Sequence, residues 1–408
     1  MQKRIFMSLG IIIVIFFVII ILIGCDIGGN NNVDMKEGCV GVIEIADGKQ
    51  HSYVGWYDDN LQYKGRSKIK IPNITSTGCK SLRKDGFIYL VSGNTKNSSK
   101  STVVSINLKD KSRYKAYNSS KYINDITADG DLYTTSCEYL GTNVSFIEKI
   151  VDKTQKKASL SIKDIVISKI YATGHRLYAI GFGYNEYKDS ERVFSKLYVI
   201  DTDNMRVIKS IDVSDKVIDA TDMMLVEDDL YIAARTKRNE NGEEVENKSL
   251  ISMNIKTYCW SNRYVGENIG QFVGCNRISS LNRNTEPKES KSNNRNDGQD
   301  AYYIMFTNYD AVLDEGNIIY SFNLDTGHLS KKEVPNIVRD TWIRGKCIYV
   351  MGDKEIRKYC YKDYDNMFKL SKCSDDCKEN NNDYFVRKNK LKNNFSNRIS
   401  RFTCFLRN

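Results

Sequence analysis

The sequence predicts an all-β fold, a β-propeller of seven four-stranded blades. The chain of 408 residues is rich in tyrosine (26) and poor in proline (3). Short runs of β-branched and aromatic residues alternate with polar turns, and beyond residue 24 no long helical pattern of apolar residues occurs. These observations favour short strands joined by turns.

A tyrosine recurs along the chain, each time in a short apolar run that follows a turn. These residues are Tyr89, Tyr133, Tyr178, Tyr231, Tyr303 and Tyr349. The two longest intervals contain polar stretches at 183–192, 237–248 and 282–299, which have no apolar periodicity and which we interpret as loops. Without these loops every interval is 42 to 46 residues, the period of a propeller blade.

Lys196–Val213 is the clearest part of this repeat. Two apolar runs flank the polar turn Asp201–Asn204, a pattern typical of a hairpin. Together with the residues before it, this hairpin predicts one complete blade over 166–213. One period before Tyr89, Val40–Ile45 begins another unit, and the predicted total is therefore seven.

The repeat resembles the YVTN and pyrroloquinoline-quinone-like superfamily of seven-bladed propellers. The strand–turn–strand core of Leu197–Val213 is the best match, and Ser105–Lys111 and Ser321–Gly327 are weaker copies. The resemblance covers roughly residues 40–361 and implies only the fold. The tryptophan docking motifs of quinoprotein dehydrogenases, the tryptophan–aspartate repeat and the sialidase-type Asp box are absent from the sequence.

The N-terminal segment has a basic start and a long apolar run: Lys3 and Arg4 precede Ile5–Ile23, and the tetrapeptide Leu-Ile-Gly-Cys ends at Cys25. This pattern resembles a bacterial lipoprotein signal peptide, whose lipobox the tetrapeptide matches. The resemblance implies cleavage after Gly24 and a diacylated Cys25. The alternative is an uncleaved signal anchor, because the run is close to the roughly 20 residues that span a bilayer. Both interpretations place the body of the protein outside the cytoplasmic membrane.

The tail of the chain differs in composition from the repeats. It is polar and basic, and we expect most of it to be disordered. The alternatives are that Phe402–Leu406 returns as a strand that closes the ring, or that a frameshift has altered the C-terminus. The predicted organisation is a signal peptide over 1–24, the lipidated cysteine and a flexible tether over 25–38, the propeller over 39–370 and the tail over 371–408.

Cysteines and charge constrain the compartment and the partner. Besides Cys25, ten cysteines permit disulfides in an exported protein, and we favour the pair Cys347 and Cys360 in consecutive predicted strands. The formal charge is +10, of which 371–408 carries +5. This distribution favours anionic lipid or wall polymer over nucleic acid as a partner.

Catalytic signatures are scarce in the sequence. His51, His175 and His328 each lie in or beside a predicted turn, and no metal-binding or phosphate-binding motif occurs. We interpret Gly181-Phe182-Gly183 as flexibility at a strand end rather than a cofactor turn. We therefore expect no catalytic residue, no metal and no cofactor.

One register suggests a ligand site. Polar residues lie nine positions before the repeat tyrosines, at Lys80, Asn124, Lys169, Asp222 and Asp340. On the innermost strand of each blade they would ring one mouth of the central channel. The alternative is that they are polar residues at the solvent edge of a strand. Residues two positions later are mostly apolar and are expected to pack between blades: Leu82, Ile126, Tyr171, Met224 and Trp342. The loops 237–248 and 282–299 are the other candidates for recognition.

These observations predict a lipid-anchored protein of the cell membrane that faces the extracytoplasmic side. Its propeller is expected to bind or scaffold a protein or a cell-envelope polymer, not nucleic acid. One alternative is a propeller-type lyase or hydrolase acting on a glycan at the channel mouth. Another is an envelope-assembly factor that resembles the propeller lipoprotein of outer-membrane barrel insertion machinery.

Overall fold

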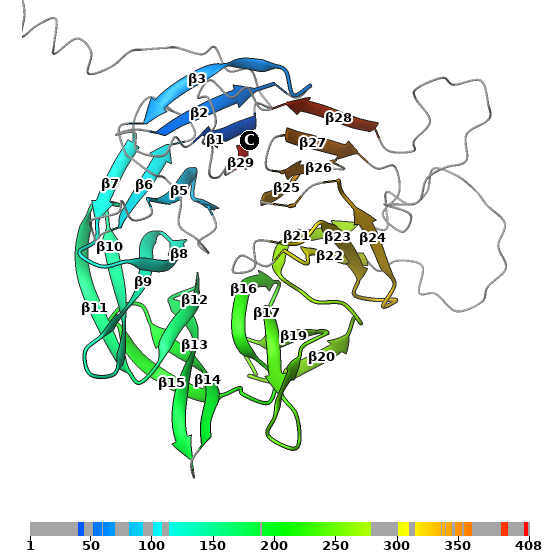
Figure 1. Cartoon of the computed structure of the whole chain (residues 1–408). Helices are drawn as coiled ribbons and strands as arrows, with labels where there is room; N and C mark the ends of the chain where they lie inside the picture. The colour runs from blue at the N-terminus through cyan, green and yellow to red at the C-terminus, as the bar shows by residue number, and fades with distance from the viewer. Residues whose placement is uncertain are drawn as a thin grey trace, which may run out of the picture.

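The computed structural model is a ring of seven antiparallel β-sheets (Figure 1). The prediction of an all-β, seven-bladed propeller is confirmed. The described residues contain no helix, and hence none that is long and apolar enough to cross a membrane. The structure describes residues 40–44, 52–58, 60–69, 81–92, 101–107, 114–187, 190–278, 301–309, 315–335, 337–338, 340–344, 347–352, 355–360, 385–390 and 404–406.

Blades 2 to 4 each contain four strands that follow one another outward from the axis of the ring. Blade 2 consists of β4 (Leu82–Lys84), β5 (Phe87–Ser92), β6 (Thr102–Asn107) and β7 (Tyr114–Asn118). Blade 3 consists of β8 (Ile123–Asp129), β9 (Asp131–Tyr139), β10 (Asn143–Val151) and β11 (Gln155–Lys163). Blade 4 consists of β12 (Val166–Thr173), β13 (Arg176–Tyr187), β14 (Ser190–Asp201) and β15 (Arg206–Asp212).

Blades 5 to 7 repeat this order, with one added strand in blade 5. Blade 5 consists of β16 (Ile218–Val226), β17 (Asp229–Arg238), β19 (Ser249–Asn254) and β20 (Trp260–Tyr264), and β18 (Glu244–Glu246) pairs with β17. Blade 6 consists of β21 (Gln271–Ile278), β22 (Ala301–Thr307), β23 (Ile318–Asn323) and β24 (Leu329–Glu333). Blade 7 consists of β25 (Asp340–Arg344), β26 (Cys347–Met351), β27 (Glu355–Cys360) and β28 (Phe385–Lys390).

Blade 1 closes the ring by joining the two ends of the chain. Its strands are β29 (Cys404–Leu406), β1 (Val40–Glu44), β2 (Ser52–Tyr57) and β3 (Tyr63–Ile69), in that order outward. Val40 lies opposite Leu406 on one side and opposite Tyr57 on the other. Pairing of β29 covers the edge that β1 would otherwise expose.

The last part of the chain contributes two strands to the propeller. Both β28 and β29 lie in 371–408, the range that the sequence predicts to be a separate tail. The expected boundary at residue 370 therefore differs from the structure at these strands, because partner strands in blades 7 and 1 pair with them. The rest of 371–408 and the expected signal peptide and tether over 1–38 lie outside the described residues.

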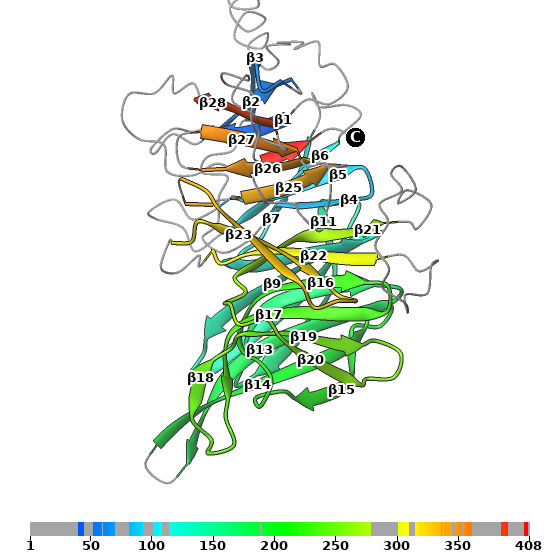
Figure 2. The same cartoon turned by 90° about the vertical axis from the view of Figure 1, so that its right-hand side faces the viewer.

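The strand order defines two faces of the ring. Linkers between blades and hairpins between second and third strands form one face, the linker face. The other turns form the opposite face, where Val40 and Leu406 also lie, and we call it the terminus face. Figure 2 shows the ring edge on, with the long β13–β14 hairpin at lower left and the C-terminus at the right.

Blade 4 confirms the blade predicted over 166–213. The turn after β14 is stabilised by the Asp201 carboxylate, whose Oδ1 accepts the N–H of Asp203 at 2.9 Å. This bond, with a further one from Asn204, lowers the pKa of Asp201. Asn254 and Asn323 accept backbone N–H groups in the equivalent turns of blades 5 and 6, and the turn therefore repeats as the sequence indicates.

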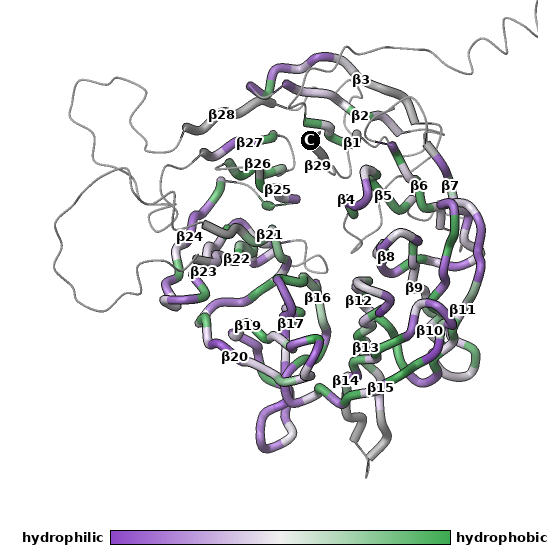
Figure 3. The backbone as a smooth tube through the Cα atoms, turned by 180° about the vertical axis from the view of Figure 1, so that it is seen from behind, coloured by the Kyte–Doolittle hydropathy of each residue, from purple (hydrophilic) through white to green (hydrophobic). Residues whose placement is uncertain are grey.

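The core lies between blades. Each repeat tyrosine is on the second strand of its blade and is buried, as expected for a packing residue: Tyr89, Tyr133, Tyr178, Tyr231, Tyr303 and Tyr349. Tyr133 and Ile147 of blade 3, for example, pack in one cluster with Ile170 and Leu177 of blade 4. Burial raises the pKa of Tyr89 to about 12. Figure 3 shows the complementary pattern, in which the outer strand β11 is largely hydrophilic.

Gly181 and Gly183 lie inside β13, not at a strand end as the sequence suggested. A Cβ on Gly183 would lie 2.3 Å from the carbonyl oxygen of Asp164, and one on Gly181 would lie 2.4 Å from that of Val166. Glycine at these positions therefore permits the close approach of the backbone that leads into β12.

Cysteines of the described residues are in both redox states. Cys137, Cys259 and Cys275 are free thiols. Cys347 is disulfide-bonded, and Cys360 lies directly opposite it in the ladder between β26 and β27. Directly opposite residues of an antiparallel pair have the Cα separation that a disulfide needs, so Cys360 stays the partner predicted for Cys347.

Candidate functional site

Four of the five residues predicted to ring the channel mouth lie on innermost strands. They are Asn124 on β8, Lys169 on β12, Asp222 on β16 and Asp340 on β25. The fifth, Lys80, lies outside the described residues. Innermost strands of neighbouring blades contact one another, as β12 does with β8 and β16. Counting back from the repeat tyrosines was therefore sufficient to identify residues on the innermost strands.

The fixed offset of nine positions selects the wrong residue in blade 3. Lys169 and Asp222 each lie two positions before the partner of a repeat tyrosine, Tyr171 opposite Tyr178 and Met224 opposite Tyr231. In blade 3 the partner of Tyr133 is Thr127, and the equivalent residue is Asp125, not Asn124. The cause is the first hairpin of blade 3, in which a single residue, Gly130, separates the paired Asp129 and Asp131.

A β-bulge occurs at an equivalent position in the innermost strands of blades 3, 4, 5 and 6. The ladder register shifts between Ile123 and Asp125, between Ile167 and Lys169, between Ala220 and Asp222, and between Phe272 and Gly274. In blades 3, 4 and 5 the unpaired residue of the bulge lies immediately before Asp125, Lys169 and Asp222, respectively. A bulge increases the local twist and redirects the side chains beside it, so Asp125, Lys169 and Asp222 share one backbone setting.

Asp125 is the most enclosed member of this group. It is 8% exposed, its Oδ2 accepts the N–H of Ile170 at 2.9 Å, and its Oδ1 lies 3.8 Å from Nζ of Lys169. Burial raises the pKa of the Asp125 carboxyl, and the negative charge of Asp222 adds to this effect. Lys169 and the N–H of Ile170 act in the opposite direction without overcoming it.

The three charges form a row, Asp–Lys–Asp, over blades 3, 4 and 5. We call Asp125, Lys169 and Asp222 the inner charged row. The Asp222 carboxylate repeats the role of Asp125, because its Oδ2 accepts the N–H of Phe272 in blade 6 at 2.8 Å. Its Oδ1 accepts the N–H of Met223 at 3.0 Å. Each carboxylate of the row therefore binds the backbone of the next blade.

Asn124 and Asp340 also form hydrogen bonds with backbone groups. The side-chain amide of Asn124 donates to the carbonyl oxygen of Ile167 in blade 4 at 3.3 Å, and Asp340 accepts the N–H of Thr341 at 2.8 Å. Among the described residues, no three potential ligands gather to hold a metal ion. The bond of Asn124 joins blade 3 to blade 4, whereas the bond of Asp340 lies within one strand of blade 7.

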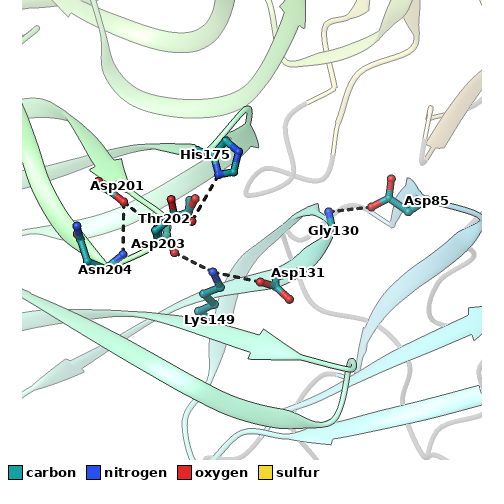
Figure 4. Close-up of polar contacts among 9 residues, drawn as sticks. All are labelled: Asp85, Gly130, Asp131, Lys149, His175, Asp201, Thr202, Asp203 and Asn204. Atoms are coloured by element: carbon teal, nitrogen blue, oxygen red, sulfur yellow. Dashed lines mark hydrogen bonds and ion pairs between the residues drawn. The ribbon is translucent and has the colours of Figure 1, made fainter.

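Hairpins on the terminus face are connected in the same way (Figure 4). Asp85 of blade 2 accepts the N–H of Gly130 at 3.1 Å, and Asp129 of blade 3 accepts the N–H of Gly174 at 2.7 Å. Both glycines have positive φ angles, which a residue with a side chain adopts only with strain. Nζ of Lys84 lies 3.4 Å from Oδ1 of Asp129, so these contacts connect three blades.

A buried lysine joins blade 3 to blade 4 beneath these hairpins. Nζ of Lys149 donates to the carbonyl oxygen of Thr202 at 2.8 Å and lies 3.1 Å from Asp131 (Figure 4). Burial opposes the charge, but Asp131 and Tyr133 outweigh it and raise the pKa of Lys149. The sequence contains no obvious signal for this contact, because Lys149 occurs within an apolar strand that alternates irregularly.

The histidines behave as surface residues. His175 lies in the turn between β12 and β13 with an 82% exposed side chain, and its Nδ1 is 3.4 Å from the exposed carboxylate of Asp203. His328 is exposed in the turn between β23 and β24. His51 lies outside the described residues.

The insertion in blade 5 is an ordered hairpin rather than a loop. Within 237–248, β18 extends the ladder of β17, and Asn239 accepts the N–H of Glu243 at 2.9 Å. Its exposed face carries four carboxylates, at Glu240, Glu243, Glu244 and Glu246. The second expected loop, 282–299, lies outside the described residues.

Exposed apolar side chains gather on the linker face. Of the six large hydrophobic residues that are exposed in the described part of the chain, four lie there, and we call them the apolar rim. They are Tyr139 (76% exposed) and Leu140 (64%) in blade 3, Tyr184 (54%) in blade 4 and Tyr264 (76%) in blade 5. The sequence pattern missed them because a hydrophobic residue at a strand end is indistinguishable from a core residue.

Comparisons with known proteins show a similarity of fold but do not assign the chain to a family. No protein-family pattern matches the chain, and no curated protein matches its sequence. A putative 6-phosphogluconolactonase from Bacteroides fragilis covers 80% of this chain and 91% of its own, at 10% identity and a TM-score of 0.44. A single-site variant of the Synechocystis apocarotenoid oxygenase covers 91% and 93%, at 5% identity and a TM-score of 0.44. At these identities the likeness concerns the propeller fold alone.

Proposed function

We propose that this protein is a membrane-anchored extracytoplasmic lipoprotein whose propeller binds or scaffolds a protein or cell-envelope ligand. Its anchor is the lipid on Cys25, the last residue of the lipobox. Its ring is of the YVTN and pyrroloquinoline-quinone-like type, a proposal supported by the side-chain-stabilised turns at Asp201 and Asn323. These turns coincide with the segments that resemble the superfamily.

The apolar rim is the observation that carries the binding function. Single exposed hydrophobic residues are common on any protein, but clustered ones mark interaction sites. Here they occur on one face of three consecutive blades, and two of them, Tyr139 and Leu140, are adjacent in one hairpin. Tyrosine at the tips of hairpins on a rigid scaffold is typical of recognition surfaces.

Charge indicates the kind of partner. Tyr264 lies opposite Ser249 in blade 5, at the base of the hairpin that exposes Glu240, Glu243 and Glu244, whereas Glu246 is paired with Lys248. A partner that covers both features needs apolar side chains beside basic ones, because charges across an interface are arranged to be complementary. We therefore favour a protein with a basic docking segment over an anionic wall polymer.

The inner charged row is proposed to have a structural rather than a catalytic role. Asp125 and Asp222 both bind backbone N–H groups of the following blade. A general acid or base needs a proton that it can exchange with a substrate, whereas these carboxylates are occupied by groups that hold the ring together.

Lipidation is tested with native protein and a Cys25→Ala variant. We expect the native protein to lose residues 1–24, to gain the mass of a diacylglycerol and to partition into detergent. The variant should keep residues 1–24, because the modified cysteine directs cleavage. Intact-mass measurement decides between the two anchors: if both proteins keep residues 1–24 and have no adduct, the chain is held by an uncleaved helix.

Binding is tested by placing a photo-crosslinking amino acid at Leu140, Tyr264 or Ile208 in cells. Ile208 is the matched control, because it is 48% exposed and apolar but lies on the outer strand β15. We expect the same partner to crosslink at Leu140 and Tyr264 and not at Ile208. With that partner purified, the double substitution Tyr139→Ser and Leu140→Ser should weaken affinity about tenfold or more. Equal crosslinking at Ile208 would reject the apolar rim as the interface.

A further inference from the structure

The two faces of the ring are not equivalent with respect to the N-terminus. The first described residue, Val40, starts β1 and lies opposite Leu406. All innermost strands run from the linker face to the terminus face, and β1 is antiparallel to the innermost strand β29. Val40 therefore begins at the terminus face, and the preceding residues join the ring there.

The length of chain before Val40 limits how the ring can sit over a membrane. Cys25 is 15 residues before Val40, and a flexible linker of that length has a root-mean-square span of roughly 20 Å. Strands of the blades have up to 12 residues, and a typical nine-residue strand such as β9 is about 30 Å long. Fully extended, 15 residues span about 50 Å, so a linker that passed the ring to reach the other face would be stretched well beyond its root-mean-square span, at a cost in chain entropy.

We infer that a lipid anchor at Cys25 holds the propeller with its terminus face toward the bilayer and its linker face away from it. The inference rests on the proposed lipidation. It assigns the apolar rim to the surface that faces away from the membrane. The occupant of that surface is then a water-borne protein, and Tyr139 and Leu140 do not insert between lipids.

Repulsion between surface carboxylates and anionic lipids is the main effect that opposes this orientation. The terminus face exposes carboxylates at Asp85, Asp129, Asp152, Asp203, Glu227 and Asp325, which anionic lipid headgroups repel. The exposed cations Arg206 and Lys256, and the pairing of Asp129 with Lys84, reduce this repulsion. This repulsion is screened over about 8 Å at physiological ionic strength, a distance shorter than the span of the linker. Repulsion therefore keeps the terminus face from lying flat on the bilayer without turning the ring over.

The test measures which face is closer to the bilayer. Full-length lipidated protein is reconstituted in vesicles of phosphatidylethanolamine and phosphatidylglycerol that contain an acceptor-labelled lipid. A donor fluorophore is attached through an unnatural amino acid at Asp203, 70% exposed on the terminus face, or at Tyr139, 76% exposed on the linker face. Because the faces are about 30 Å apart, we expect energy transfer from position 203 to be about twofold or more higher than from position 139.

The outcomes separate this inference from the proposal on which it rests. Equal transfer at both positions, or higher transfer at position 139, in protein that carries the lipid by mass overturns the orientation and leaves the lipoprotein proposal intact. Protein without the lipid adduct that fails to bind vesicles overturns both. A protein that lacks residues 1–25 and carries the same two donors is the control for transfer that does not depend on the anchor.

Discussion

Replacement of Asp125 by alanine is expected to lower the free energy of unfolding by about 2–4 kcal/mol. The Asp125 side chain is 11% exposed, and its carboxylate accepts the N–H of Ile170 while lying beside the ammonium of Lys169. Alanine removes the acceptor from a buried N–H group and one partner from a lysine whose side chain is 12% exposed. Urea denaturation followed by tryptophan fluorescence measures the loss.

Asp125→Asn is expected to cost less than about 1 kcal/mol near neutral pH, because the amide oxygen still accepts the N–H of Ile170. The raised pKa of Asp125, caused first by burial, means that the folded state holds the proton more tightly than the unfolded chain. Wild-type stability should therefore fall as pH rises from about 4, the unfolded pKa, to the folded pKa. The asparagine variant lacks this slope, and its stability relative to wild type should increase over the same interval.

The matched control is Asp129→Ala. Asp129 also accepts an N–H of the next blade, from Gly174, but its side chain is 37% exposed. Water can replace the lost acceptor there, so we expect a cost of about 1 kcal/mol or less. If Asp125→Ala costs no more than this control, burial is not what makes the inner charged row important to stability.

Tyr117→Phe is expected to lower the free energy of unfolding by about 1–3 kcal/mol. The hydroxyl of Tyr117, on the outer strand of blade 2, donates to Glu148 of blade 3 at 2.7 Å. Glu148 is 3% exposed. A buried carboxylate that loses a hydrogen-bond donor has no water to replace it, so the folded state is destabilised. The same urea titration measures this effect.

Lys156→Met is the control for the Tyr117 prediction, because Lys156 also binds Glu148, at 3.2 Å, but its side chain is 50% exposed. It should cost less than about 1 kcal/mol. Burial, with Glu148 adding to it, raises the pKa of Tyr117, so the folded state resists its ionisation. Wild type should consequently lose more stability above pH 10 than Tyr117→Phe does, and parallel pH profiles would contradict this assignment.

The candidate site shows where counting along the sequence succeeds and where it fails. A constant offset from the repeat tyrosines identified Lys169 and Asp222, because hairpins of equal length keep strands in the same register. It selected Asn124 instead of Asp125 because the turn at Gly130 is one residue shorter. The shorter turn follows from the pairing of Asp129 with Asp131 across Gly130. This pairing depends on the positive φ angle of Gly130, which the sequence alone does not reveal.

The sequence by itself determined the repeating unit. Periodic tyrosines, alternating apolar residues and Asx turns such as that at Asp201 are local features, and each blade forms its strands from them. The sequence offered Phe402–Leu406 as an alternative closing strand, and the tertiary structure decided for it, because β29 pairs with β1 across more than 360 residues of chain. The tertiary structure also decided which polar groups, such as Asp125 and Lys149, contact the next blade. Such contacts join residues of different blades, and their partners are chosen by packing of whole sheets rather than by neighbouring residues in the chain.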